Sequence, residues 1–306
     1  EYNSVSIYNW QNETLVASAA GAKEATLAFA FGLAGESGAA GAAGAGSRKR
    51  GQDTLEGLTV VQAGKRHVLF HSWQGRSVST RKGLVGVHSK ASAYYAAAWL
   101  HGNAILGTDT GALYQFHGRS RKESYKAHSG AVYALHVPTA QSALGAAMFS
   151  GGADGKVISW SANMEQLAAW SIADVAGNVV VRPRVRALSL NAEGTRLAVG
   201  TISSEIIELS PENGAVVSTD AEGNATALVR GHYRDELWGL ATSPVNPDTY
   251  VTVGDDGMLA VWSLESRSCV AKADVGGVAR CITFHPSGAF LAVGLGGDAN
   301  RTGDAA

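Results

Sequence analysis

A histidine, a serine and an aspartate, the residue types of a hydrolytic triad, occur in this chain at spacings that could bring them together. His128 precedes Ser150 by 22 residues, and Asp154 follows Ser150 by four. Held in a hydrogen-bonded row, such a set makes the serine hydroxyl a nucleophile toward esters and amides. However, the sequence around Ser150 lacks the turn that exposes a nucleophile and helps to form an oxyanion hole. The alternative is that the three side chains satisfy one another inside the fold.

A second copy of the pattern decides between these alternatives. His232, Thr252 and Asp256 repeat it, and in each copy a tryptophan follows six residues after the aspartate, namely Trp160 and Trp262. We expect each aspartate to accept a hydrogen bond from the histidine ring, and each hydroxyl to join the other ring nitrogen to the indole N–H. A set that is repeated and ends on a buried indole is structural. The sequence therefore predicts no catalytic residue, and it contains no motif for a metal ion, a nucleotide or another cofactor.

Short β-strands are the elements that must position these two sets. Apolar runs of strand length are separated by Gly, Asp, Asn and Ser, and a unit that begins with His and ends with Trp is typical of a β-propeller blade of about 40 residues. The pattern predicts an all-β fold of five four-stranded blades flanked by two half blades, over residues 4–19, 26–80, 94–126, 131–172, 185–219, 236–273 and 280–293. The two half blades either close one ring or belong to two successive propellers.

The composition favours a folded chain with one exception. Hydrophobic residues make up 45% of the 306 residues and charged ones 17%, which argues against disorder. No apolar run is long enough to span a bilayer, so no membrane partner is expected. Cys269 and Cys281 lie in apolar runs and are expected to be reduced and buried. The exception is the Gly- and Ala-rich stretch of residues 33–56, which is expected to form a flexible insertion.

Positive charge is concentrated in one part of the chain. Residues 48–126 carry thirteen Lys or Arg and four acidic residues, so their net charge is +9 while the rest of the chain carries −10. Seven of these cations flank the predicted fourth strands of two neighbouring blades, and they are Arg76, Arg81, Lys82, Arg119, Arg121, Lys122 and Lys126. Because fourth strands form the outer rim of a propeller, the sequence predicts a basic rim that binds an acidic partner such as a tubulin surface. The alternative is that these cations only protect edge strands from pairing with other chains. Aromatic residues do not interleave with them, so no nucleic-acid partner is expected.

The segment around the second histidine carries a family resemblance. Residues 231–241 read Gly-His-Tyr-Arg-Asp-Glu-Leu-Trp-Gly-Leu-Ala. This resembles the signature of the echinoderm microtubule-associated protein-like family, which runs from Gly-His to Glu-Leu-Trp-Gly-Leu. Further segments are similar to the family in the same order, at residues 5–10, 64–70, 107–111, 126–130, 150–160 and 284–288. The resemblance covers nearly the whole chain outside the Gly- and Ala-rich stretch.

This resemblance implies a WD-repeat protein with two joined propellers and a crossover near residue 230. We therefore expect residues 1–230 to form later blades of a first propeller and residues 231–306 to begin a second. The resemblance also implies a non-enzymatic scaffold of the cytoplasm and cytoskeleton or of the ciliary axoneme, whose partners are tubulin and other cytoskeletal or axonemal proteins. The competing hypothesis is a WD-repeat adaptor that binds protein partners in cilia or signalling without touching tubulin.

Overall fold

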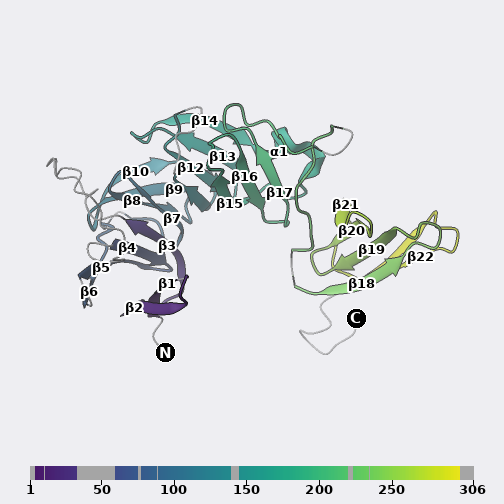
Figure 1. Ribbon diagram of the computed structural model, residues 1–306, viewed down its shortest axis with the longest axis horizontal. Coiled ribbons are helices and arrows are strands. Elements are labelled where there is room, and N and C mark those ends of the chain that lie inside the picture. Colours follow the sequence, from purple (N-terminus) through teal and green to yellow (C-terminus); the bar gives the residue numbers. More distant parts are fainter. Residues whose placement is uncertain are drawn as a thin grey trace. The chain divides into compact units, whose positions relative to one another are not determined.

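The computed structural model describes residues 4–9, 11–32, 59–74, 77–87, 89–138, 145–219, 223–233 and 235–296 (Figure 1). The chain divides into an N-terminal unit of residues 1–171 and 184–197 and a C-terminal unit of residues 172–183 and 198–306. The expected insertion of residues 33–56 lies outside the described residues. The propeller boundary expected after residue 230 stays a prediction.

The N-terminal unit is built from antiparallel sheets whose strands follow one another in chain order. A two-stranded sheet comes first, with β1 (Ser4–Asn9) and β2 (Thr14–Ala20). Three four-stranded sheets follow: β3 (Thr26–Gly32), β4 (Thr59–Gly64), β5 (His67–Gln74) and β6 (Ser77–Lys82); β7 (Tyr94–Leu100), β8 (Asn103–Thr108), β9 (Ala112–His117) and β10 (Ser120–Lys126); β11 (Val132–His136), β12 (Met148–Gly152), β13 (Lys156–Trp160) and β14 (Gln166–Ser171). This is the strand order of propeller blades.

The later sheets continue the same pattern. One turn of helix, α1 (Ile172–Ala176), and the 3-10 helix η1 (Gly177–Val179) precede a three-stranded sheet of β15 (Val185–Leu190), β16 (Leu197–Thr201) and β17 (Ile206–Leu209). A four-stranded sheet contains β18 (Leu237–Thr242), β19 (Thr249–Gly254), β20 (Met258–Ser263) and β21 (Ser268–Asp274), and a two-stranded sheet contains β22 (Ala279–Phe284) and β23 (Leu291–Leu295). The expected all-β class and blade-like sheets are confirmed.

The core of the N-terminal unit lies between neighbouring sheets, so its central strands are buried on both faces. Phe70 of β5 packs against Phe116 of β9, with ring centroids 5.8 Å apart. The next cluster joins Ile105 of β8 to Val132 of β11, and both side chains are fully buried. Close packing requires glycine at Gly107, where a Cβ atom would lie 2.8 Å from Val132 Cγ1. These apolar layers hold the sheets in a fixed order, so the outer strands present their side chains from a rigid base.

The expectation of four strands in the blade of residues 185–219 is wrong, because residues 215–219, which would supply the fourth, form no strand. Only isolated bridges occur there, including one between Leu209 and Val216. Ser218 bonds to its neighbours through its side chain: its Oγ donates to Thr226 O at 2.6 Å and accepts from Glu208 N at 3.4 Å. Serine hydroxyls that bond to backbone groups compete with regular strand pairing in this way.

One of the two cysteine expectations is also wrong. Cys269 is buried as expected, whereas Cys281 is exposed. Cys281 neighbours the buried Ile282 on β22, and successive residues of a strand point to opposite faces. The apolar run therefore predicted the strand correctly, but it did not indicate that one face of this strand is exposed to solvent.

Candidate binding rim and histidine networks

The first histidine network is closed on itself. His128 Nδ1 lies 2.9 Å from Asp154 Oδ1, and His128 Nε2 lies 2.9 Å from Ser150 Oγ. Trp160 Nε1 donates to the same Ser150 oxygen at 2.9 Å. Because Asp154 must accept, the ring donates from Nδ1 and accepts the Ser150 hydroxyl proton at Nε2. The structure thus brings the four residues together, and the serine hydroxyl, which is 0% exposed, is out of reach of a substrate.

The second network has the same geometry in the C-terminal unit. His232 Nδ1 lies 3.0 Å from Asp256 Oδ1, and His232 Nε2 lies 2.8 Å from Thr252 Oγ1. Trp262 Nε1 donates to that hydroxyl at 2.7 Å. The indole also stacks on Tyr250, with ring centroids 5.9 Å apart and an interplanar angle of 7°. The network therefore fixes a tryptophan near the outer side of its sheet.

The electrostatics of the first network favour a neutral His128 beside an ionised Asp154. Burial lowers the pKa of His128, against the opposing effect of Asp154. Burial alone would raise the pKa of Asp154, but the Ser129 backbone N–H and the His128 ring outweigh it and lower that pKa. The pKa of Asp256 is lowered in the same way, against its burial. The pair of His128 and Asp154 is thus a directed hydrogen bond that orients the ring, and it needs no proton taken from solvent.

The outer strands β6 and β10 of neighbouring sheets meet just beyond the end of β6. Leu84 forms a parallel bridge with Ser120, in which Leu84 N donates to Arg119 O at 2.7 Å and Arg121 N donates to Leu84 O at 2.9 Å. The Arg119 side chain also reaches Lys82 O at 3.5 Å. This backbone pairing brings the cations at the end of β6 next to those at the start of β10.

We call the cations of these two strands the basic rim, and its described members are Arg81, Lys82, Arg119, Arg121, Lys122 and Lys126. All are exposed except Arg121, which is half-buried. The guanidinium of Arg121 lies over the ring of Tyr114, 4.5 Å from its centroid, which restricts its motion. Lys122 is the extra residue of a β-bulge between Arg121 and Glu123. Lys126 lies apart from the bridge and lines a separate cavity of about 600 Å³. The seventh predicted cation, Arg76, lies outside the described residues.

The rim cations keep their charge available. In the described part of the chain, none of them forms an ion pair with an acidic side chain; the ion pairs there involve other residues. One acid, Glu123, is exposed among them. The rim is therefore a local excess of positive charge that faces solvent, which is the arrangement that attracts an acidic surface.

A buried ion cluster in the C-terminal unit was missed by the sequence analysis. Lys272 Nζ lies 3.4 Å from Glu205 Oε1, and the two side chains are 3% and 0% exposed. The ammonium also donates to Ser203 O at 2.9 Å and to Gly231 O. Glu205 Oε2 accepts from the hydroxyls of Thr201 and Ser203. Both charges are thus surrounded by polar partners, as buried charges must be.

A signal for this cluster was present in the sequence. Thr201 precedes Glu205 by four residues, which is the spacing from hydroxyl to acid in both histidine networks. Here the acid is a glutamate, and a lysine from β21 takes the place of the histidine. The repeat was overlooked because no Asp-Gly turn and no tryptophan mark this copy.

Other polar groups have structural partners as well. His71, fully buried, lies 2.9 Å from Gln62 Oε1 and 3.0 Å from Thr80 Oγ1. Over the described ranges, no three His, Cys, Asp or Glu side chains converge as ligands for a metal ion. No helix in those ranges has the length and apolar character needed to cross a membrane.

Comparison with curated proteins shows which known proteins this chain resembles. No family model matches the chain. Mouse echinoderm microtubule-associated protein-like 2 is 31% identical over 239 residues, which cover 77% of this chain and 33% of the mouse protein. The human protein of the same name is 27% identical over 294 residues, 95% of this chain and 38% of its own length. Echinoderm microtubule-associated protein-like 4 of Xenopus laevis is 27% identical over 253 residues, 77% and 25% of the two chains.

The chain is thus similar to several proteins of the echinoderm microtubule-associated protein-like family. The family resemblance carried by residues 231–241 is therefore confirmed. The chain spans roughly a third of the length of these relatives.

The structure also shows what the family-like signature of residues 231–241 does in this chain. Trp238 Nε1 donates to Asp255 Oδ1 at 3.0 Å, and Arg280 lies 4.6 Å over the Trp238 ring. Arg280 also pairs with Asp255 at 2.9 Å. A Cβ atom on Gly239 would lie 2.6 Å from Val253 Cγ2, so glycine is needed there. The signature thus fastens β18 to the turn after β19 and to β22.

Proposed function

We propose that this chain is a non-enzymatic microtubule-associated scaffold whose basic rim contacts acidic surfaces of tubulin. The observation that carries the proposal is the Leu84–Ser120 bridge, which gathers cations from two outer strands into one exposed set. The relatives of this chain carry the name of microtubule-associated proteins. The proposed place of action is the cytoplasm and cytoskeleton, including the ciliary axoneme, where other cytoskeletal proteins would be further partners. Neither a nucleic acid nor a membrane is among the proposed partners.

The mechanism is rigid display of charge. The sheets beneath the rim are packed at fully buried residues such as Phe116 and Leu106. The rim strands therefore keep their spacing when a partner binds, and little ordering entropy is lost. Arg121 adds to this because Tyr114 already holds its guanidinium in place. At an ionic strength of about 0.1 M, opposite charges attract each other over a range of about 10 Å, so several clustered cations can act together on one acidic surface.

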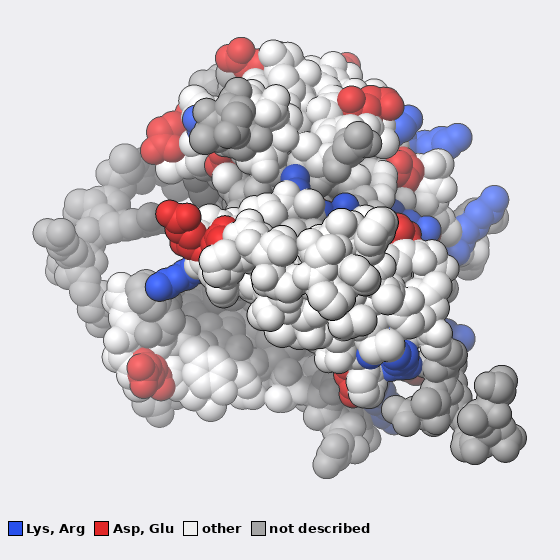
Figure 2. All heavy atoms as spheres, turned by 90° about the vertical axis from the view of Figure 1, so that its right-hand side faces the viewer, with Lys and Arg blue, Asp and Glu red and all other residues white. Residues whose placement is uncertain are grey.

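A second candidate is the adaptor that binds protein partners without tubulin. On the face shown in Figure 2, uncharged side chains cover most of the surface between scattered acidic and basic groups. Exposed apolar side chains include Leu240 of β18, at 61%, and Phe290, at 70%. Contacts through such residues would depend little on salt, whereas binding through the rim weakens steeply as ionic strength rises.

Microtubule co-sedimentation tests the rim. The full-length protein would be compared with a variant that carries Lys82→Glu, Arg119→Glu and Lys122→Glu, all at exposed rim positions. The matched control carries Lys65→Glu, Arg66→Glu and Lys156→Glu, which change the net charge equally at exposed positions outside the rim. We expect only the rim variant to lose pelleting. If both variants lost pelleting equally, binding would depend on net charge and not on the rim. If neither variant lost pelleting, the adaptor hypothesis would be favoured.

A further inference from the structure

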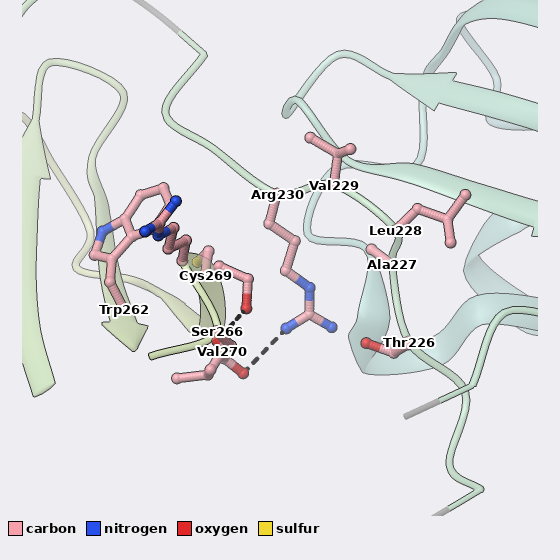
Figure 3. Close-up of a pocket in the computed structure, with 11 residues that line it drawn as sticks. Thr226, Ala227, Leu228, Val229, Arg230, Trp262, Ser266, Cys269 and Val270 are labelled. Carbon is pink, nitrogen blue, oxygen red and sulfur yellow. Dashed lines mark hydrogen bonds between the residues drawn. The ribbon is translucent and has the colours of Figure 1, made fainter. Parts of the chain in front are cut away.

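A cavity of about 740 Å³ in the C-terminal unit lies between two stretches of extended chain (Figure 3). Residues 226–230 form one wall, residues 266–270 at the start of β21 form the other, and Trp262 lies on the same side as residues 266–270. The lining contains two arginines, Arg230 and Arg267, and no acidic residue. The cavity thus carries net positive charge, in a chain whose overall charge is −1.

The wall formed by β21 offers backbone that one more strand could pair with. β21 is the last strand of its sheet and pairs with β20 on one side only. The opposite wall pairs with Ile206 of β17, through Leu228 N to Ile206 O at 2.8 Å and Ile206 N to Val229 O at 2.9 Å. An extended segment that lies beside the edge of β21 gains main-chain hydrogen bonds, which is the usual way in which strands are added to sheets.

Arg230 is the group in this cavity that most clearly lacks a partner. Its Nε atom is buried and has no hydrogen-bond partner among the described residues. Its terminal nitrogen makes one long bond, 3.4 Å to Val270 O, as Figure 3 shows. A guanidinium presents a planar fork of donors that fits a carboxylate with two parallel bonds. A carboxylate in the cavity would therefore satisfy a donor that the protein leaves unsatisfied.

The other side chains around the cavity add apolar contacts. Leu228 is 55% exposed, Val229 50% and Val270 52%. Trp262 is held by Thr252 and by stacking on Tyr250, so it provides a firm wall. Since side chains of a strand alternate between faces, a ligand with acidic residues on one face and apolar residues on the other would match both sets.

We propose that this cavity binds an extended acidic peptide segment of a partner protein, which adds as a strand beside β21 and places a carboxylate on Arg230 with support from Arg267. The site is separate from the basic rim and uses none of its residues. It would give the scaffold a second means of holding a partner, selective for an extended backbone as well as for negative charge.

Fluorescence anisotropy with a labelled peptide of alternating Glu and Val tests the site in the full-length protein. We expect binding that falls by about tenfold or more in an Arg230→Gln, Arg267→Gln double variant, because charge-assisted bidentate bonds are lost. Arg230→Lys, which keeps the charge but not the fork, should weaken binding to a lesser extent. Lys156→Gln removes an exposed cation elsewhere and should have no effect. Circular dichroism and thermal unfolding would verify that each variant is folded, and Arg267→Gln alone changes only an exposed side chain.

Control peptides and the rim variant complete the test. A peptide with Gln in place of Glu, and one in which Pro replaces Val, should both bind weakly, because the first lacks carboxylates and the second cannot pair as a strand. The proposal is overturned if either control peptide binds as well as the first, or if the Arg230→Gln, Arg267→Gln variant binds normally. The rim variant should keep peptide binding and lose microtubule pelleting, so failure at this site and failure of the proposed function are distinguishable.

Discussion

Replacement of Lys272 by methionine provides a sharp test of the buried ion cluster. Methionine keeps most of the apolar stem and removes the ammonium, so little volume changes. The substitution removes the donor to Ser203 O and to Gly231 O and the positive partner of Glu205. Glu205 is then left as a fully buried carboxylate with only the hydroxyls of Thr201 and Ser203.

The expected loss follows from these partners. Removal of one member of a buried ion pair destabilises a protein by about 3–5 kcal/mol, because the other charge stays buried without compensation. Glu205→Gln should destabilise by a smaller amount, since Lys272 keeps two carbonyl acceptors. The double variant should be more stable than the sum of the single losses implies, by about 1 kcal/mol or more, because neither charge is left alone.

Urea unfolding followed by tryptophan fluorescence would measure the total loss, and hydrogen exchange would locate it. Exchange should accelerate in the turn between β16 and β17 and along β21, while the N-terminal unit stays protected. Lys156→Met, at an exposed lysine, is the control and should change stability by less than about 0.5 kcal/mol. If Lys272→Met cost less than about 1 kcal/mol, or if the two substitutions were simply additive, the cluster would not be the coupled unit inferred from its geometry.

Three further predictions concern the N-terminal unit. Ser150→Ala should lower stability by about 1–3 kcal/mol in a urea titration, because two buried groups lose their shared partner; an unchanged midpoint would contradict the network. Stability should fall on acidification in two steps. Below about pH 6.5 the unfolded chain binds a proton at His128, whereas the folded chain does not, because its His128 pKa is lowered. Below about pH 4 the same difference arises at Asp154, whose pKa is also lowered in the folded chain. A midpoint in thermal unfolding that stayed constant from pH 7 to pH 5 would refute this. Gly107→Ala should destabilise by about 1–3 kcal/mol through the clash with the next sheet, whereas Gly277→Ala, with no atom within 4 Å of the added carbon, should not.

The sequence predicted the blade-like sheets well because strand residues and turn residues alternate clearly along it. The two histidine networks were also predictable, since a spacing of four from hydroxyl to Asp and six from Asp to Trp fixes three positions on adjacent strands. Residues 215–219 were predicted as a strand because their apolar residues suggested one. There, however, the hydroxyl of Ser218 bonds to backbone groups that a strand would have used.

The two proposed binding sites depend on contacts between distant residues, which the local sequence pattern does not encode. Charge counting placed cations on β6 and β10, but their meeting at the Leu84–Ser120 bridge depends on how two sheets pack. The pairing of Lys272 with Glu205 joins residues 67 positions apart, and no repeating pattern in the sequence marks it. The cavity at Arg230 likewise arises only when residues 226–230 run alongside β17.

The distance along the chain between each buried acid and its nitrogen partner has a consequence for the order in which the chain folds. His128 lies 26 residues before Asp154, so that network can close as soon as its own sheet forms. Glu205, in contrast, pairs with Lys272, which is synthesised 67 residues later and lies on β21, the outer strand of another sheet. Long-range closure is slow because the intervening loop loses entropy before the contact compensates for it. During synthesis the sheet of β16 and β17 therefore carries an uncompensated carboxylate until β21 arrives, and it becomes the part of the nascent chain most dependent on completion of its neighbour.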